Sequence, residues 1–242
     1  MKGVKQLETV QLVERIVSKM KSLIYGKILW PVENKETYIE FQNPEDARRW
    51  SEKYYGQWSR AYLERERLVE RVKVKVSLCH KPMEKYCGHV YRNINMLLRN
   101  SLDDGCSIWR TQINLIIRDL LEAPRIPSNL VLYRLVNDDF IVELVNNNNA
   151  KNPMPTQEKG FMSTSLCKDI VNSGDHYAKY NNLLKIYVDK GTVGAYVNMI
   201  AGRTENEILL LPNMYLALAE FPYMDLETGK TIFECKLLSD LW

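Results

Sequence analysis

The sequence lacks any cysteine pattern that would build a disulfide framework or a zinc site. Its cysteines are scattered, none belongs to a Cys-x-x-Cys pair, and an odd number of them cannot all pair within one chain. We therefore expect free thiols or small core residues, and no metal site. The five are Cys79, Cys87, Cys106, Cys167 and Cys235.

Long apolar runs are also missing. No stretch of about 18 consecutive apolar residues, the length of a membrane-spanning helix, occurs in the chain. The chain does not start with the charged segment and apolar block of an export signal, so such a signal has been removed or was never present. We expect no membrane span.

Neither a strong charge imbalance nor a nucleotide-binding glycine motif is present. The net charge is only +3 and Lys/Arg clusters are absent, so nucleic-acid binding is not expected. Gly-x-Gly-x-x-Gly and P-loop motifs are absent too, so no dinucleotide would be held in the Rossmann manner. The 242 residues, 45% hydrophobic and 26% charged, fit a soluble globular protein of one large domain, or one domain with a helical extension.

The first half of the chain has the apolar periodicity of helices. Residues 6–24 repeat apolar side chains at helical spacing and predict one amphipathic helix. A second helix is expected to start at Asn43, an N-cap residue followed by Pro44 at the first helical position, and to carry its aromatics as a core stripe. Residues 86–99 and 107–121 predict two more helices.

The second half predicts short strands bounded by glycine, proline and asparagine, without the strand–helix alternation of a parallel sheet. The Asn- and Pro-rich stretch 146–156 and residues 171–177 are expected to be loops. The fold class is therefore α+β, with an N-terminal helical region packed on antiparallel β-sheets. The expected strands cover residues 129–136, 160–166, 183–188, 194–197, 205–211, 215–220 and 231–238.

Two carboxylates stand two residues apart near the C-terminal end. Glu205 and Glu207 flank Asn206 where a polar loop meets the apolar run 208–211. Alternate residues of a strand face the same side, so we expect both carboxylates in one cleft and Asn206 turned away. Two like charges in one site indicate a raised pKa, a shared cation or a substrate that needs both. The alternative is a solvated acidic turn.

A polar helix face precedes the strands. Tyr91, Asn95 and Arg99 are four residues apart and share one side of the helix predicted at 86–99. A ring, an amide and a guanidinium can stack on a base, hydrogen-bond a ribose and pair with phosphate. The alternative is surface variation on an ordinary helix.

A guanidinium and two hydroxyls mark the first two predicted strands. Arg134 interrupts an apolar strand, and burying it unpaired would cost several kcal/mol. It therefore needs an anion, either a protein carboxylate or a bound phosphate. Ser163 and Ser165 face one side of the next strand, although cross-strand hydroxyl pairs produce the same pattern.

The order of these pieces resembles the Arg-Ser-Glu class of mono-ADP-ribosyltransferase toxins. Tyr-x-x-x-Asn-x-x-x-Arg on a helix is followed by an aromatic-Arg strand, Ser-Thr-Ser and Glu-x-Glu. The sequence is similar to the catalytic domains of binary actin-modifying toxins such as iota toxin, and to Rho-modifying exoenzymes, from about residue 46 to the C-terminus. The resemblance implies a core of two antiparallel β-sheets, a helical extension over residues 1–40 and a catalytic domain over residues 41–242.

The resemblance implies a transferase that splits NAD at the nicotinamide–ribose bond and passes ADP-ribose to a protein side chain, with no metal. Arg134 would hold a phosphate, and Ser163 would help fix the nicotinamide ribose and Glu207. Glu207 would bind the ribose 2′-hydroxyl and stabilise the developing positive charge. Glu205 would orient or deprotonate the nucleophile. The other residues expected to bind NAD are Tyr86, Tyr91, Asn95, Arg99 and Tyr177.

The acceptor and the target follow from details of the same resemblance. Glutamate at the position of Glu205 accompanies arginine modification in the family, so arginine is the expected acceptor. Leu135 and Tyr180 stand where actin-modifying relatives carry further arginines, and the loop before Glu205 is shorter and lacks their aromatic, so actin is not assumed. The implied protein is a secreted or injected bacterial toxin that modifies a host protein in the target-cell cytosol, with a separate delivery component as a further expected partner.

Two other functions fit the same residues. One is a catalytically silent NAD-fold module that binds a partner, and the other is an NAD glycohydrolase that labels no protein. Nicotinamide release separates the first from an enzyme, and labelling of protein separates the second from a transferase.

Overall fold

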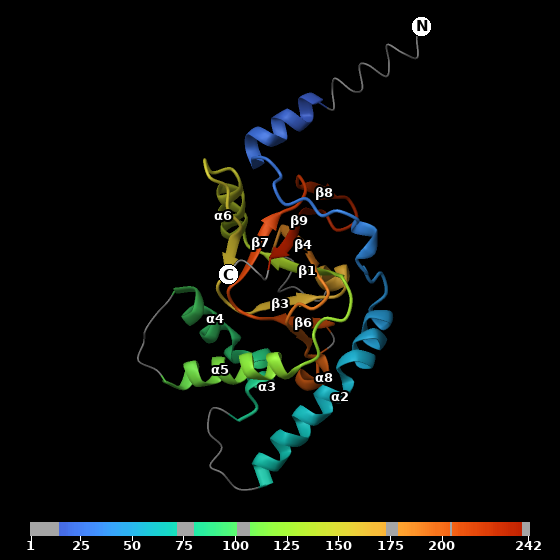
Figure 1. Ribbon diagram of the computed structural model, residues 1–242, viewed down its shortest axis with the longest axis vertical. Helices are drawn as coiled ribbons and strands as arrows, with labels where there is room; N and C mark the ends of the chain where they lie inside the picture. Colours follow the sequence, from blue (N-terminus) through green and yellow to red (C-terminus); the bar gives the residue numbers. More distant parts are fainter. Residues whose placement is uncertain (1–14, 72–79, 101–106, 173–178, 204, 239–242) are drawn as a thin grey trace.

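The structure is a computed structural model that describes residues 15–71, 80–100, 107–172, 179–203 and 205–238. A β-sheet forms its centre, several helices of the first half gather at one end, and a helix over residues 15–25 projects from the other end (Figure 1). The further helices and helical turns are η1 (Lys35–Thr37), α2 (Pro44–Arg71), α3 (Pro82–Lys85), η2 (Tyr86–Val90), α4 (Tyr91–Asn100), α5 (Ser107–Glu122), α6 (Asp138–Asn148), η3 (Lys168–Asn172) and α8 (Asn198–Ala201).

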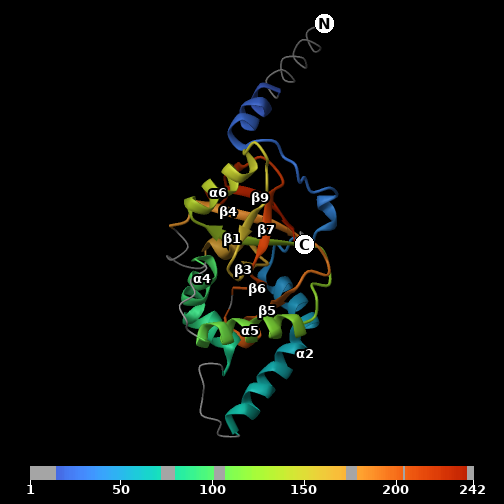
Figure 2. The same ribbon diagram turned by 60° about the vertical axis from the view of Figure 1, so that its left-hand side comes forward.

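The strands join in the order β2-β7-β9-β4-β1-β3-β6-β5, with β8 paired to β9. Helix α5 contacts β5 at one end of this sheet, and α6 contacts β2 and β7 at the other (Figure 2). The strands are β1 (Leu130–Val136), β2 (Thr156–Glu158), β3 (Met162–Ser165), β4 (Asn182–Val188), β5 (Gly194–Tyr196), β6 (Glu207–Leu210), β7 (Met214–Leu218), β8 (Tyr223–Asp225) and β9 (Lys230–Leu238).

The α+β class is confirmed, but the expected pair of purely antiparallel sheets needs correction. All the described strands belong to one sheet, and β4 and β9 run parallel. The strands from β2 to β1 and the strands β3, β6 and β5 meet where β1 pairs with β3 through a single residue pair, Tyr133 with Ser165. Residue patterns along a strand show which side is buried, whereas the neighbour and its direction depend on contacts far away in sequence. This narrow junction places β1 beside β3.

The expected helices are present with small changes. Helix α2 begins at Pro44 as predicted, and the backbone N–H of Glu45 donates to Asn43 Oδ1 at 2.9 Å. The helix predicted at 86–99 begins earlier, at Pro82 of α3, and passes through the π-helical turn η2 into α4. The stretch predicted as the loop 146–156 is shorter, because α6 extends to residue 148 and β2 begins at residue 156. Elements α6, α8, β2 and β8 were not anticipated from the sequence.

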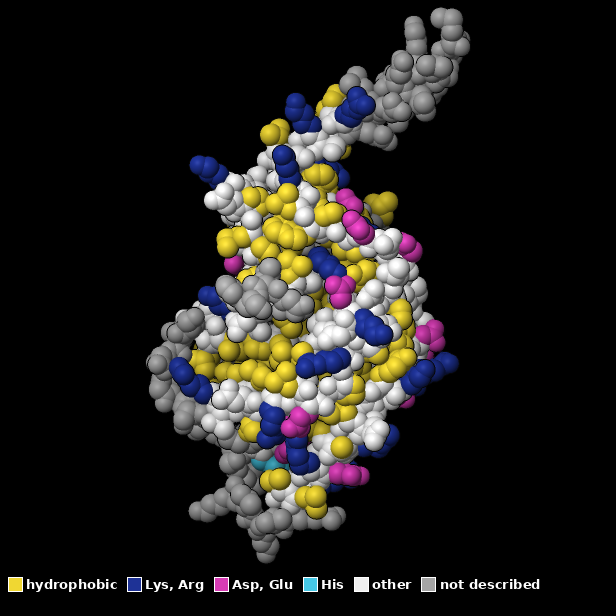
Figure 3. All heavy atoms as spheres, viewed as in Figure 1, with side chains coloured by type: hydrophobic (Ala, Val, Ile, Leu, Met, Phe, Trp, Pro, Cys, Tyr) yellow, Lys and Arg dark blue, Asp and Glu magenta, His cyan; other side chains and the backbone are white. Residues whose placement is uncertain are grey.

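The N-terminal helix is described only over residues 15–25, and residues 6–14 of the predicted helix lie outside the described parts. Its apolar side chains are exposed instead of packed against the sheet. Figure 3 shows Lys and Arg side chains next to apolar ones along this helix. Within the described residues, no helix has the length and apolar character needed to cross a bilayer.

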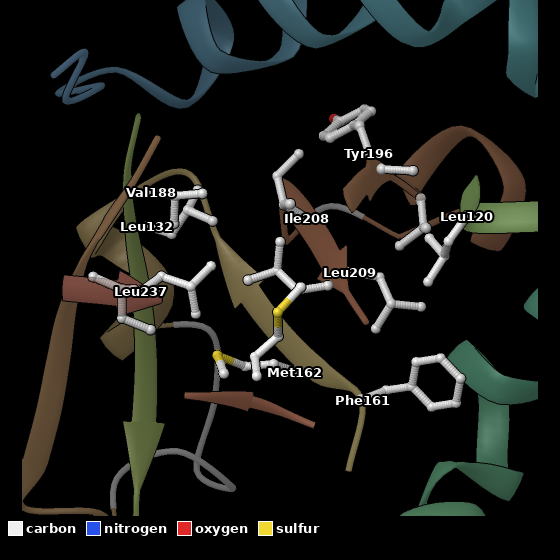
Figure 4. Close-up of a cluster of buried hydrophobic side chains, with 14 of the residues drawn as sticks. Leu120, Leu132, Phe161, Met162, Val188, Tyr196, Ile208, Leu209 and Leu237 are labelled. Atoms are coloured by element: carbon white, nitrogen blue, oxygen red, sulfur yellow. The ribbon is translucent and has the colours of Figure 1, made fainter. Parts of the chain in front are cut away.

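The main core lies between the sheet and the helices at its end. In Figure 4, side chains from β1, β3, β4, β6 and β9 converge with Leu120 of α5 and with Phe161, which precedes β3. All the labelled side chains are buried. A core packed this closely fixes the positions of β1, β3 and β6 relative to one another. The buried free cysteines are Cys87, Cys167 and Cys235, whereas Cys79 and Cys106 lie outside the described residues.

A segment just before α2 closes the opposite side of the sheet. Ile39 pairs with Leu130 of β1 in an isolated parallel bridge. Glu40 accepts a hydrogen bond from Tyr133 and another, of 2.8 Å, from Lys185. Residues 35–41 therefore belong to the folded body. They cover a smaller buried cluster made of Val131, Tyr133, Ile170, Val171, Leu183, Tyr187 and Ile232.

Candidate active site

A cavity of about 830 Å³ opens where α4, β1, β3 and the start of β6 meet. Ligand sites of roughly 300–1,000 Å³ are typical of proteins. Tyr177 lies outside the described residues. The other sequence-predicted site residues all line the cavity: Tyr86, Tyr91, Asn95, Arg99, Arg134, Ser163, Glu205 and Glu207.

Arg134 reaches the cavity from β1 and has an anionic protein partner. Its Nη2 lies 3.0 Å from Glu158 Oε2. Its Nη1 is buried and has no hydrogen-bond partner among the described residues. Burial lowers the pKa of Arg134, partly offset by the nearby charge of Glu158. The sequence allows two anions as partners of Arg134, a protein carboxylate or a phosphate. The carboxylate of Glu158 binds Nη2, and Nη1 remains as a donor for a second anion.

Glu158 is the site residue that sequence reasoning missed. It sits at the end of β2, nearly buried, and accepts hydrogen bonds of 2.9 Å from both Nε and Nη2 of Arg99, in addition to the bond from Arg134. The backbone N–H of Gly160 donates to it as well, at 2.9 Å. Burial alone would raise the pKa of Glu158, but Arg134 and Arg99 bring it below the ordinary value. One carboxylate thus orients two guanidiniums at this end of the cavity.

Glu207 is the first residue of β6 and lies next to Ser163 of β3. Ser163 Oγ donates to Glu207 Oε1 at 2.5 Å, while Glu207 Oε2 is buried without a hydrogen-bond partner in the described parts of the chain. The backbone N–H of Glu207 donates to Asn198 Oδ1 at 2.8 Å. Burial raises the pKa of Glu207, and the hydrogen bond from Ser163 opposes that rise. The carboxylate is held rigidly, with one oxygen left for a ligand.

Glu205 and Glu207 both line the cavity, as the sequence predicts, but strand alternation is not the cause. Glu205 precedes β6, and Asn206 between them has a left-handed backbone with φ of 50°. The Asn206 side chain turns away, accepting from Tyr196 Oη at 3.0 Å and donating to the Pro44 carbonyl at 3.2 Å. Asparagine tolerates this conformation better than most residues. A left-handed turn therefore directs both acids to one side.

Helix α4 presents the predicted polar face, although Asn95 is bound by the protein itself. Its Oδ1 accepts the backbone N–H of Phe161 at 2.9 Å, and its Nδ2 donates to Tyr86 Oη at 3.1 Å. Asn95 thereby ties α4 to the start of β3. Tyr91 and Arg99 lie on the more open part of the same face.

Charged side chains of both signs line the cavity. Arg99 and Arg134 both pair with Glu158, and Glu205 and Glu207 add two carboxylates to the lining. Arg203 Nη1 is 3.5 Å from Glu205 Oε2, so this outer acid has a cationic neighbour. Leu135 and Tyr180, which replace expected arginines, also line the cavity. Across the described residues, no group of three or more His, Cys, Asp or Glu is arranged to hold a metal ion.

Solved structures define the class of this fold. The chain is similar to Plx2a, an ADP-ribosyltransferase toxin from Paenibacillus larvae, with a TM-score of 0.63 and 20% identity over 84% of this chain and 100% of the toxin. The Clostridium limosum C3 exoenzyme matches with a TM-score of 0.60 and 19% identity over 84% and 98% of the two chains. BECa, an ADP-ribosylating toxin of a C. perfringens binary enterotoxin solved with NADH, matches with 0.63 and 20% over 84% of this chain but 50% of BECa. The fold is that of the ADP-ribosyltransferase toxins.

The family follows from the sequence match. The model of the ADP-ribosyltransferase exoenzyme family matches residues 47–222, a range that includes all the cavity residues named above. The protein belongs to the ADP-ribosyltransferase exoenzyme family, which confirms the resemblance seen in the order of its motifs. No curated protein sequence matches the chain.

Proposed function

We propose that the protein is a mono-ADP-ribosyltransferase that splits NAD and transfers ADP-ribose to arginine side chains of a host protein. Two unsatisfied polar atoms of residues that line the cavity support this proposal: the donor Arg134 Nη1 and the acceptor Glu207 Oε2. Buried polar atoms in native proteins are almost always hydrogen-bonded, so each calls for a ligand group. A phosphate oxygen fits the donor and a ribose hydroxyl fits the acceptor. NAD carries both groups, and BECa, of the same fold, is described with NADH.

Arg99 and Arg134 form the phosphate-binding end. The single carboxylate of Glu158 neutralises only part of two guanidinium charges, so a net positive charge remains for an anionic ligand. Because Glu158 holds both side chains in place, little side-chain entropy is lost when they bind a pyrophosphate. The protein carboxylate and the phosphate are thus complementary partners of Arg134.

Ser163 and Glu207 act at the nicotinamide ribose. Oε2 of Glu207 accepts the ribose 2′-hydroxyl, and Ser163 holds the carboxylate in that orientation through Oε1. A fixed carboxylate near the anomeric carbon stabilises the positive charge that develops there as nicotinamide leaves, as in glycoside hydrolysis. Burial strengthens this interaction because water is excluded.

Glu205 orients the incoming nucleophile at the outer edge of the site. Its side chain is only partly buried and already lies 3.5 Å from the guanidinium of Arg203. A carboxylate that pairs with one guanidinium has the charge and shape to pair with an arginine from another protein. This geometry, together with the family's association of glutamate at this position with arginine modification, supports arginine as the acceptor.

The setting of the activity follows from the same proposal. The protein acts as a secreted or injected bacterial toxin in the cytosol of a target cell, where both NAD and host proteins are present, and a separate delivery component brings it there. Residues 41–242 are the proposed catalytic domain and residues 1–40 the proposed extension, of which the part from Lys35 onward packs on that domain.

Nicotinamide release from NAD tests the proposal directly. We expect the parent protein to release nicotinamide, and Glu207→Gln to lower the rate by at least on the order of 10²–10³-fold, the usual loss for a group that stabilises the transition-state charge. Glu205→Gln should retain NAD hydrolysis but lose most labelling of an arginine-rich protein or lysate with labelled NAD. The exposed Glu227→Gln serves as the matched control and should change neither reaction.

Each alternative function predicts a different pattern. No release by the parent protein would identify a catalytically silent module. Release without labelling of any lysate protein would identify an NAD glycohydrolase. Equal loss of hydrolysis and transfer in Glu205→Gln would contradict the role given to Glu205, while transfer to asparagine or cysteine would replace arginine as the acceptor.

A further inference from the structure

The helix over residues 15–25 carries an apolar face that nothing in the described structure covers. Five apolar side chains at positions i, i+1, i+4, i+7 and i+8 fall on one side of it. Their exposed fractions are far above those of core residues. They are Ile16 (51%), Val17 (45%), Met20 (58%), Leu23 (75%) and Ile24 (58%).

The rest of the described part, residues 15–25, is basic and contains no acid, although Glu14 directly precedes it. Arg15 and Lys19 border the apolar face on one side and Lys21 borders it on the other, with serines between them. No Asp or Glu occurs from residue 15 to residue 32, where Lys27 adds a further positive charge. Apolar and basic side chains are visible together on this helix in Figure 3.

Among the described residues, the helix is attached to the body at its C-terminal end, where Tyr25 and the following Ile28 pack against the main core. Asn148 Nδ2 donates to the carbonyls of Tyr25 and Lys27 at 2.6 and 3.1 Å, and Asn149 Nδ2 donates to the carbonyl of Leu23 at 3.3 Å. These bonds satisfy carbonyls that a helix end leaves without partners. Gly26, with φ of 75°, comes so close to α6 that an added Cβ would lie 2.7 Å from the Asn148 carbonyl. These contacts fix the turn after the helix against α6, and the helix projects away from the body.

We propose that this helix is a membrane-surface anchor that lies in the interface of a bilayer containing anionic lipids. An exposed apolar face flanked by Lys and Arg is the arrangement of interfacial helices, in which the apolar side enters the acyl boundary and the basic side chains contact anionic headgroups. An apolar protein groove would complement the five apolar side chains but leave the acid-free basic border without a partner. The charge therefore favours an anionic surface. The described part of the helix is too short to cross a bilayer, and its basic side chains suit a position along the headgroups.

The anchor is separate from the proposed catalytic site. None of its residues lines the cavity, and the family match begins at residue 47. Lipid binding and NAD cleavage can therefore succeed or fail independently. A surface anchor would keep the enzyme close to acceptor proteins at the membrane.

Vesicle sedimentation with the full chain tests the anchor. We expect binding to phosphatidylcholine vesicles that contain about 30% phosphatidylserine, whose negative surface resembles that of a cytosolic leaflet. Binding to vesicles of phosphatidylcholine alone should be much weaker. Salt near 0.5 M should reduce binding because it screens the basic side chains. Met20→Asp with Leu23→Asp, and separately Lys19→Gln with Lys21→Gln, should each weaken binding on the order of tenfold or more.

Leu226→Asp is the matched control, since Leu226 is 93% exposed but lies between β8 and β9. This variant should bind vesicles like the parent, and all variants should keep the parent's melting temperature and rate of nicotinamide release.

Binding without any preference for phosphatidylserine, or equal loss in Leu226→Asp, would overturn the proposal. A parent dimer in sedimentation equilibrium that Met20→Asp with Leu23→Asp dissociates, without vesicle binding, would instead make a second copy the occupant. Vesicle-independent binding of a purified delivery protein would assign the face to that protein.

Discussion

At the scale of single residues, the placement of two arginines depends on Glu158. We expect Glu158→Gln to lower the free energy of unfolding by about 3–5 kcal/mol, because it leaves buried guanidinium charge without its carboxylate. Urea unfolding at pH 7 measures this loss. Glu33→Gln, at an exposed position, should change stability by no more than about 0.5 kcal/mol.

The same variant has a defined pH dependence. The folded-state pKa of Glu158 is below its ordinary value of 4.5, so its stabilisation is fully present above that pH and is lost as the pH falls through the folded-state pKa. The stability gap between parent and variant should therefore narrow in acid. A gap that stays constant down to pH 3 would contradict the ion-pair explanation.

Ser163 should control the acidic limit of the proposed activity. Burial raises the pKa of Glu207 above 4.5 and the hydrogen bond from Ser163 lowers it, so the carboxylate protonates, and activity falls, at a pH above the ordinary glutamate value. Ser163→Ala should move the acidic limb of kcat/KM for nicotinamide release to still higher pH. Ser163→Thr, which keeps a hydroxyl, should leave the limb near its original position. Coinciding limbs in all three proteins would show that this hydrogen bond does not tune Glu207.

Residue types in order along the chain were sufficient to select Arg134, Ser163 and Glu207, because each is an unusual side chain in an apolar or strand-like context. Glu158 has no such context. The sequence shows that Arg134 needs an anion, but it contains 30 acidic residues and offers no basis for choosing among them. The choice depends on the fold, because the chain leaves β2 at Glu158 and enters β3, which pairs with the strand that carries Arg134, and no local pattern encodes this pairing.

At the scale of elements, the start of β6 shows a correct prediction with a different physical cause. Strand alternation predicts that Glu205 and Glu207 share a side, yet β6 begins only at Glu207. The left-handed backbone of Asn206 produces the same outcome, and its bonds to Tyr196 and to the start of α2 stabilise the turn. The sequence does not predict this turn, because an asparagine next to a strand can adopt either a left-handed turn or the strand conformation.

The asparagine-rich stretch at the C-terminal end of α6 is another element that local propensity describes incorrectly. Asparagine, a poor helix former, predicts a loop, but α6 continues through residue 148. The side chains of Asn148 and Asn149 then bind carbonyls at the end of the N-terminal helix, more than a hundred residues earlier in the chain. Tertiary hydrogen bonds thus use residues that local propensity assigns to a loop.

At the scale of the whole molecule, the extension before α2 divides into two parts with different roles. A chain beginning at Pro31 loses the projecting helix, its hydrogen bonds with α6 and the packing of Tyr25 and Ile28 on the core, so we expect its free energy of unfolding to fall by about 1–3 kcal/mol. A chain beginning at Phe41 also loses Lys35, Tyr38 and Glu40. Buried Glu234 loses the ammonium of Lys35 and keeps only the hydroxyls of Tyr187 and Tyr223, while the Tyr133 hydroxyl loses Glu40. We therefore expect a larger loss, of more than about 3 kcal/mol.

Urea unfolding of the two truncated chains, compared with the full chain, checks this division. The chain from Pro31 should also retain the parent's rate of nicotinamide release. Equal stability of the two truncated chains would place the boundary of the catalytic domain at residue 40, as the resemblance implies. A greater loss in the chain from Pro31 than in the chain from Phe41 would contradict the contacts described for residues 35–41.

The sequence by itself determined the class of the protein: helices before strands, and an arginine, serines and two glutamates in the order typical of the family. These properties depend on local periodicity and residue chemistry, which neighbouring residues specify. Only the tertiary structure decided that the strands form one sheet with a parallel pair, that Glu158 holds both arginines, and that the N-terminal apolar face stays exposed. Each of these depends on which distant segments meet, and such contacts arise from packing of the whole chain.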